Sequence, residues 1–123
     1  MVDKPEDCPI ELWYSVCEFW PENEVLNAIN IVRLESGFNA FALNDTATKA
    51  GGCGVPIGTL QGVGIVSERS VGYFQINSCN FAGWDWHTLY NARMNAGTAH
   101  MLWDQAGQSW RPWYFSATKL GLL

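Results

Sequence analysis

The sequence predicts an α+β fold that is mainly helical and carries one small antiparallel β-hairpin. Two stretches repeat apolar residues at helical intervals between helix-breaking residues, and a stretch between them places two β-prone runs around the polar residues "SERS". The chain has 123 residues, the usual size of one domain with a real core. Because it contains no internal repeat, low-complexity tract or linker, residues 1–123 are expected to form a single domain.

The first two expected elements are helices. Residues 8–20, "CPIELWYSVCEFW", place Ile10, Trp13, Tyr14 and Cys17 at a helical spacing, so we expect a short helix there. The next stretch, "PENEVLNAINIVRLESG", begins with a proline and two acidic residues suited to a helix start. It ends in a glycine suited to a helix stop, which predicts a second and longer helix.

The rest of the chain alternates loop, hairpin and helix. Residues 47–64, "ATKAGGCGVPIGTLQGVG", have no helical period and are expected to form a long loop. The segment "GIVSERSVGYFQIN" predicts a hairpin whose turn carries Glu68 and Arg69. Residues 91–107 repeat apolar residues at helical intervals between a capping asparagine and a glycine, which predicts the last long helix. The aromatic end "SWRPWYFSATKLGLL" is expected to pack back on the body.

The composition narrows the range of partners. The chain is 48% hydrophobic and 15% charged, as a folded globule is, and its seven Trp, four Tyr and six Phe are an aromatic excess typical of a core, of sugar stacking or of both. A formal net charge of -5 argues against nucleic acid and anionic membranes as partners. No segment approaches the ~20 apolar residues of a membrane span, and the first residues lack the features of a signal peptide. Neither membrane insertion nor an export signal is therefore expected in this chain.

The four cysteines favour disulfides over a metal site. They show no C-x-x-C spacing, so a zinc or thioredoxin-type interpretation is weak. Sequence order favours the pairs Cys8–Cys17 and Cys53–Cys79, because each would close a local loop; four reduced thiols are the alternative. His87, like the other histidine, has no partner at ligand spacing, and no metal ion is expected.

Glu35 is the most informative single residue. The apolar stripe of the second helix is Val25, Ala28, Ile29 and Val32, and adding three to the last position reaches Glu35. Burial and the negative end of the helix dipole would both raise the pKa of this carboxyl, and a carboxylic acid kept protonated near neutral pH can act as a general acid. The alternative is a Glu that faces water at a frayed helix end or pairs with a basic neighbour, and periodicity alone favours that alternative.

The groups that could assist Glu35 are weaker candidates. Glycosidases usually carry two carboxylates, and the candidates for a second acid or base are Asp45, Glu68 and Asp85. Glu68 in the expected turn is the best of them, although an exposed turn residue is the alternative. Gln75 and Asn77 occupy alternating positions of the expected second strand, so both should point from one face. Amides there would suit hydrogen bonds to sugar hydroxyl and acetamido groups.

Three segments, in this order, resemble the lysozyme-like superfamily, in particular the transglycosylase-type domains of bacterial and phage wall-cleaving proteins: "ESGFNAFALN", "SVGYFQIN" and "LYNARMNAGTAHMLWDQAGQSWRPW". The first is similar to the family's catalytic Glu-Ser motif and the second to its cleft strand. The third departs from the Ala-Tyr-Asn-Ala-Gly motif of longer soluble transglycosylases. The resemblance runs from about Leu26 to Trp113 and implies a lysozyme-like fold whose hairpin flanks an active-site cleft.

The resemblance also implies an activity and a place of action. It implies a peptidoglycan glycosidase, or muramidase, that cuts the β-1,4 bond between N-acetylmuramic acid and N-acetylglucosamine without a cofactor. Such an enzyme acts at the bacterial cell wall, whether from outside the cell, in the periplasm or on a virion. It implies that Glu35 is the catalytic acid and that the substrate is bound by Ser36, Ser70, Tyr73, Gln75 and Asn77.

One departure from the family bears on the mechanism. Animal-type lysozymes hold a catalytic Asp just before the x-G-x-x-Q-I-N segment, and here that position is Ser70. Two routes then remain: a lytic transglycosylase that forms 1,6-anhydro ends, or an inverting lysozyme in which Glu68 or Asp45 activates water. The alternative class is a catalytically inactive wall-binding, sugar-binding or virion structural module on the same fold. Because an acidic chain is repelled by anionic walls at low salt, we expect it to need moderate ionic strength or attachment to a phage particle or a larger wall hydrolase.

Overall fold

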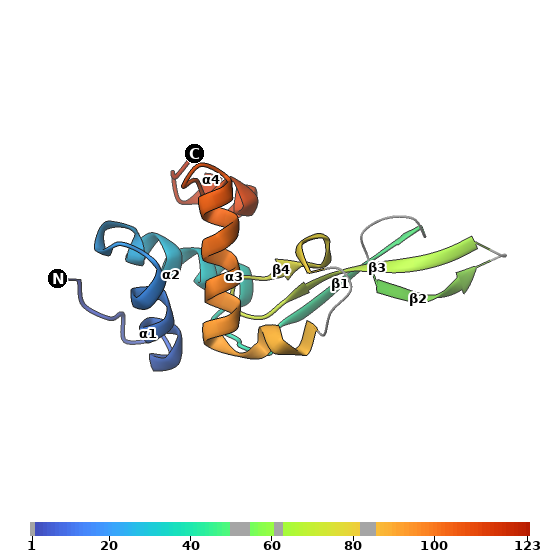
Figure 1. Cartoon of the computed structure of the whole chain (residues 1–123), viewed down its shortest axis with the longest axis horizontal. Helices are drawn as coiled ribbons and strands as arrows, with labels where there is room; N and C mark the ends of the chain where they lie inside the picture. Colours follow the sequence, from blue (N-terminus) through green and yellow to red (C-terminus); the bar gives the residue numbers. More distant parts are fainter. Residues whose placement is uncertain (1, 50–54, 61–62, 82–85) are drawn as a thin grey trace.

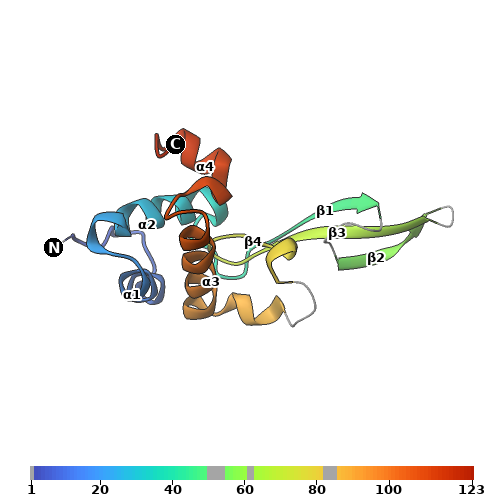
Figure 2. The same ribbon diagram turned by 45° about the horizontal axis from the view of Figure 1, so that its top comes forward.

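The chain folds into an α+β structure with its helices at one end and its sheet at the other, as the ribbon views show (Figure 1 and Figure 2). The computed structural model describes residues 2–49, 55–60, 63–81 and 86–123. In both views α3 lies between α1 and α2 on one side and the sheet on the other. The helices are α1 (Ile10–Phe19), α2 (Glu22–Ser36), α3 (Ala92–Gln105) and α4 (Tyr114–Lys119), with the 3-10 helices η1 (Ser78–Asn80), η2 (Trp86–Tyr90) and η3 (Arg111–Trp113). The strands are β1 (Leu43–Lys49), β2 (Val55–Leu60), β3 (Val63–Val71) and β4 (Ile76–Asn77).

The three helices expected from periodicity are confirmed, together with the signals that bound them. Helix α2 follows Pro21 and ends at Gly37, whose φ of 60° is the left-handed conformation that glycine adopts without strain. Helix α3 begins at Asn91, whose side chain accepts a hydrogen bond of 3.0 Å from the backbone N–H of Met94. Local sequence therefore determines where these helices stop and start.

The core is built around an aromatic cluster that joins the two ends of the sequence. The ring of Trp20, at the end of α1, stacks on Phe74 at 5.3 Å and on Trp110 at 5.6 Å between ring centroids. Trp113 packs against both Trp110 and Phe74. The expectation that the aromatic carboxyl-terminal segment packs back on the body is thus confirmed, and this packing fixes the position of α4.

The sheet differs from the expected hairpin. Its strands run antiparallel in the order β1-β3-β2, and the short β4 also pairs with β3. The expected loop over residues 47–64 was wrong for its described part, since residues 47–49, 55–60 and 63–64 are strand; residues 50–54 and 61–62 lie outside the described residues. The expected turn "SERS" was also wrong, because residues 67–70 lie inside β3 and pair with β1. Glu68 and Arg69 are therefore strand residues.

The cysteines contradict one predicted disulfide. Cys8 is a buried free thiol and Cys17 an exposed one, so the predicted Cys8–Cys17 pair is not formed. Burial raises the pKa of the Cys8 thiol to about 11, and burial raises the pKa of Cys17 as well. Cys79 is disulfide-bonded, and Cys53 lies outside the described residues.

Within residues 2–49, 55–60, 63–81 and 86–123, no helix is long and apolar enough to cross a bilayer. The same residues contain no group of three or more His, Cys, Asp or Glu side chains placed to hold a metal ion.

Candidate functional site

Glu35 lies where the buried face of α2 reaches the surface. The stripe that precedes it is buried, with Ile29 and Val32 both at 0% exposure, and Glu35 itself is half-buried one turn further on. The helix ends two residues later at Gly37, whose N–H donates to the carbonyl of Arg33. Arg33 pairs with Asp7. The carboxylate therefore continues the apolar face, as the helical phase predicted.

The partner of Glu35 comes from the other end of the chain. Ser116 on α4 is 6% exposed, and its hydroxyl donates a hydrogen bond of 2.5 Å to Oε2 of Glu35. Helix α4 is positioned by Trp113, whose indole N–H donates to the carbonyl of Phe74 at 2.8 Å. One short segment thus contacts both the carboxylate and the turn that precedes β4.

Two opposing effects act on the protonation of Glu35. Burial is the larger and raises the pKa of the carboxyl above its ordinary value. The hydrogen bond from Ser116 favours the charged form and partly offsets this rise. The net result is a carboxyl that holds its proton at a higher pH than an exposed Glu does.

Replacing Ser116 with alanine should raise the pKa of Glu35 further. The substitution removes a donor that stabilises the carboxylate and leaves the burial in place, so the protonated form gains. The measurement is an NMR titration of the Glu35 side-chain carboxyl carbon in both proteins. Ser36→Ala is the matched control, because the Ser36 hydroxyl donates to the Val32 carbonyl at 3.2 Å. A lower pKa in Ser116→Ala, or an equal rise in the control, would contradict the assignment.

One face of the sheet is polar in the region where β1, β3 and β4 pair with one another. Asn44, Ser70 and Asn77 lie directly opposite one another on β1, β3 and β4, and Thr46 lies opposite Glu68. Opposed residues of neighbouring strands share a face, and Glu68 shares it with Ser70 because they are two positions apart. This polar sheet face therefore comprises Asn44, Thr46, Glu68, Ser70 and Asn77.

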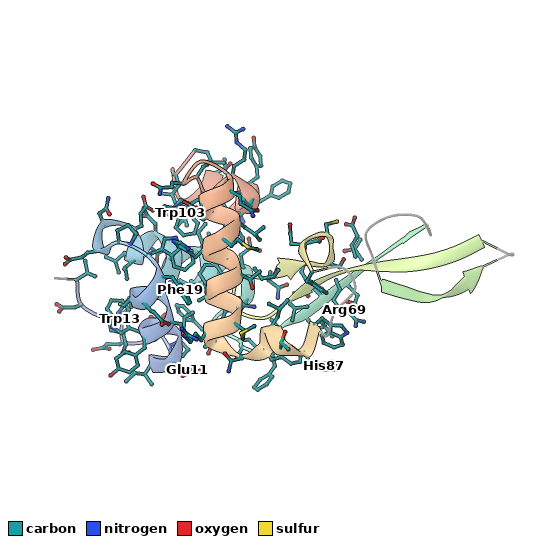
Figure 3. All side chains as sticks on the ribbon, viewed as in Figure 1. Glu11, Trp13, Phe19, Arg69, His87 and Trp103 are labelled. Atoms are coloured by element: carbon teal, nitrogen blue, oxygen red, sulfur yellow. The ribbon has the colours of Figure 1, made fainter. Side chains whose placement is uncertain are left out.

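The candidate Asp45 lies on the opposite face. It is opposed to Arg69 in the register, and its carboxylate accepts two hydrogen bonds of 2.8 Å from that guanidinium. The guanidinium also stacks over the ring of Trp86 at 4.4 Å. Figure 3 shows Arg69 at the base of the sheet, near His87 of η2. Asp45 therefore ties the sheet to η2 instead of standing beside Ser70.

The expectation that Gln75 and Asn77 share a strand face was wrong. Gln75 precedes β4 in a turn with a φ of 51°, because the chain reverses between Gly72 and Gln75. Its side-chain N–H group donates to the carbonyls of Ala42 and Gly72, and its carbonyl accepts a 2.6 Å hydrogen bond from Asn44. Gln75 thus joins the polar sheet face to the turn.

Two other expected binding residues have roles within the fold. Tyr73 is 2% exposed and donates a 2.6 Å hydrogen bond to Glu11 of α1, so its side chain lies in the core. The side-chain oxygen of Asn77 accepts from the backbone N–H of Cys79 and caps η1. Asn77 keeps its amide donor group for another partner.

A small pocket lies next to these residues. It has a volume of about 40 Å³ and lies between the β4 region and the α3 and η3 segments. Its lining residues are Gln75, Ile76, Asn77, Asn80, Leu102, Pro112 and Trp113, and we call it the Trp113 pocket. Because Trp113 comes three residues before Ser116, the pocket and Glu35 are served by the same segment. The sequence did not identify Ser116, Asn80, Leu102 or Pro112 as site residues. Its only signal for this side of the pocket was the aromatic carboxyl-terminal segment.

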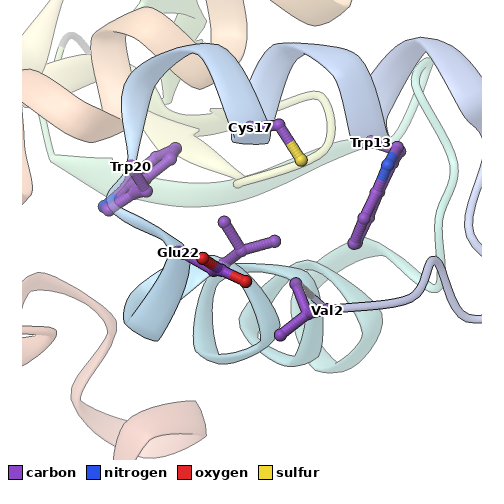
Figure 4. Close-up of a pocket in the computed structure, with 6 residues that line it drawn as sticks. Val2, Trp13, Cys17, Trp20 and Glu22 are labelled. Carbon is purple, nitrogen blue, oxygen red and sulfur yellow. The ribbon is translucent and has the colours of Figure 1, made fainter.

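A larger pocket of about 240 Å³ lies at the opposite end of α2. It is lined by Val2, Trp13, Cys17, Trp20, Glu22 and Val25 (Figure 4). Glu22 and Glu35 are separated by 13 positions of one helix, which is roughly 20 Å. This pocket is therefore separate from the group around Glu35.

Comparison with known proteins gives no relative: no family model, no curated protein and no solved structure matches the chain.

Proposed function

We propose that this chain is a peptidoglycan-cleaving glycosidase that cuts the β-1,4 bond between N-acetylmuramic acid and N-acetylglucosamine, with Glu35 as general acid and base. The observation that carries the proposal is the half-buried Glu35, whose pKa is raised by burial and whose carboxylate is held by Ser116. The three motif segments that resemble the lysozyme-like superfamily add to it. A protein with this activity would act at the bacterial cell wall.

The protonation of Glu35 suits the chemistry. Cleaving a glycosidic bond needs a proton on the leaving oxygen, and a carboxyl with a raised pKa holds that proton to a higher pH than an exposed Glu does. The hydrogen bond from Ser116 fixes the orientation of the group before substrate arrives. After donating its proton, the same group is a carboxylate that can accept one in the next step.

The surface near Glu35 suits a sugar chain. The polar sheet face offers amide and hydroxyl groups at regular intervals, and Gln75 links that face to the Trp113 pocket. At about 40 Å³ the Trp113 pocket is far smaller than a sugar ring, so it would offer an apolar wall and a few amide groups at the edge of a bound strand and would not enclose a sugar. Glycan strands of peptidoglycan present polar hydroxyl and acetamido groups as well as apolar C–H faces.

The side-chain positions limit which carboxylates could take part in each route to product. Ser70 supplies no nucleophile, and Asp45 is held by Arg69 on the other face of the sheet. In the transglycosylase route Glu35 protonates the leaving oxygen and then accepts the proton of the C6 hydroxyl of N-acetylmuramic acid. The C6 oxygen attacks C1, and a 1,6-anhydro ring forms without water. In the inverting route water attacks instead, and Glu68 is the carboxylate on the same face as Ser70.

Mass spectrometry of digested peptidoglycan tests the proposal and separates the two routes. If the transglycosylase route operates, the protein will release disaccharide fragments whose muramic acid ends are lighter by one water than reducing ends. Fragments with reducing ends would support the inverting route through Glu68. Release of no soluble fragments from purified walls, at any ionic strength, would contradict the proposal and favour a non-catalytic wall-binding or virion module.

A further inference from the structure

Helix α4 exposes two aromatic rings beside the candidate site. Phe115 is 82% exposed and Tyr114 is 59% exposed, and Phe115 has the largest exposure among the large apolar residues of the described chain. The two rings meet edge to face, with centroids 5.7 Å apart and planes at 83°. Such a pair holds each ring in place without burying it. Neighbouring exposed apolar side chains on a folded protein often belong to a binding surface.

Their neighbours in the chain place them at the site. Trp113, just before the pair, lines the Trp113 pocket, and Ser116, just after it, holds the carboxylate of Glu35. Consecutive Cα atoms are about 3.8 Å apart, so the ring of Phe115 begins one residue away from the group that contacts Glu35.

The phase of the helix assigns different positions to the two rings. Successive residues of a helix differ by about 100°, so Phe115 points to the flank of the Glu35-facing side defined by Ser116. Tyr114 points about 200° away from Ser116 around the helix axis. Its ring therefore lies on the far side of Phe115 from the site. Phe115 can therefore meet a ligand at the rim, and Tyr114 supports it from behind.

We propose that Phe115 is a specificity-determining residue that stacks on a sugar ring of the glycan strand next to the bond that Glu35 cleaves, with Tyr114 as its positioning residue. This inference rests on the proposed function. The face of a β-linked sugar that carries C–H groups is apolar, and an exposed phenyl ring covers it without needing hydrogen bonds. Phe115 then selects for strands that extend beyond the sugars bound at the polar sheet face and the Trp113 pocket.

The test compares Phe115→Ala, Phe115→Tyr and Tyr14→Ala with the parent protein on soluble, peptide-free glycan strands of defined length. Tyr14 is an aromatic residue of α1 with 67% exposure, and it serves as the matched control. We expect KM for long strands to rise about tenfold in Phe115→Ala, the loss of one stacking contact, with kcat little changed. Phe115→Tyr keeps an aromatic ring, so its KM for long strands should equal that of the parent protein. For short strands that do not reach Phe115, KM should be the same in Phe115→Ala and in the parent protein.

Several results would overturn the inference. One is a Phe115→Ala protein with the parent KM for long strands, and another is an equal loss in Tyr14→Ala. A concentration-dependent dimer in size-exclusion chromatography that Phe115→Ala dissolves would assign the rings to a second copy of the chain. These results differ from a failure of the proposed function, in which the parent protein itself cleaves no glycan strand or Glu35→Gln remains active. Circular dichroism of each variant confirms that an exposed substitution has left the fold unchanged.

Discussion

Replacing Glu35 with glutamine should reduce the clearing of purified cell walls by roughly 10³-fold, the contribution of a positioned general acid. Glutamine keeps the size of the side chain and can still accept the hydrogen bond from Ser116, but it has no proton to donate to the leaving oxygen. The measurement is the loss of turbidity of a peptidoglycan suspension at equal protein concentration. Undiminished clearing would remove Glu35 from the reaction.

The same substitution should not weaken the fold, and this separates a chemical effect from unfolding. Burial raises the pKa of Glu35 above its value in the unfolded chain, so the folded state binds more protons in the pH range between the two values. Its contribution to the free energy of unfolding is therefore fully present below the unfolded pKa and is lost as the pH rises through the folded pKa. Glutamine cannot become charged, so Glu35→Gln should be at least as stable as the parent protein at neutral pH in thermal unfolding.

Glu68→Gln is the companion variant for the second carboxylate. Glu68 shares the polar sheet face with Ser70, so it can assist water only if the inverting route operates. Under the transglycosylase route Glu68→Gln should clear walls at the parent rate. Loss of clearing in Glu68→Gln, together with reducing ends in the product, would favour the inverting route instead.

The helices could be predicted from sequence because their signals are local. The apolar stripe of α2, its proline start and its glycine stop lie within one stretch, and the same stretch predicts that Glu35 continues a buried face. The sheet could not be predicted in the same way. Strands β1 and β3 are joined by backbone pairing, and their side chains are polar on one face and mixed on the other, so they lack the apolar alternation that identifies a strand. A polar run such as "SERS" then resembles a turn, although it lies in the middle of β3.

The candidate site was predictable only in part, for a related reason. The carboxylate of Glu35 follows from helical phase, whereas its partner Ser116 lies 81 positions later in the chain and is brought near by aromatic packing. Gln75 was expected on a strand, but the left-handed backbone at Gly72 and Gln75 makes a turn that alternation cannot reveal. Contacts between distant segments leave no local signal, and this site depends on them.

Asn95 is the residue on which the turn beside the site depends most, and replacing it with alanine should strongly destabilise the fold. Its side chain is 0% exposed; its N–H group donates to the carbonyls of Val71 and Leu89, and its oxygen accepts from the N–H of Phe74, each at 2.9 Å. Alanine removes three hydrogen bonds to buried backbone groups. At about 1 kcal/mol or more for each, the loss is at least about 3 kcal/mol, or roughly 10 °C in the midpoint of thermal unfolding.

Asn91→Ala is the matched control for this prediction, since it removes the same kind of side chain from the start of the same helix. Asn91 caps α3 with one exposed hydrogen bond to Met94, so its loss should lower the free energy of unfolding by only about 1 kcal/mol. The larger effect at Asn95 follows from its burial and its close contact with the turn: a Cβ added at Gly72 would lie only 2.4 Å from the Asn95 amide nitrogen, so the amide packs directly on the turn backbone. Equal destabilisation by the two variants would mean that the turn carrying Gln75 does not depend on Asn95. A much larger loss in Asn95→Ala, with reduced sugar binding at temperatures where the protein is still folded, would show that α3 holds that turn in position for the site.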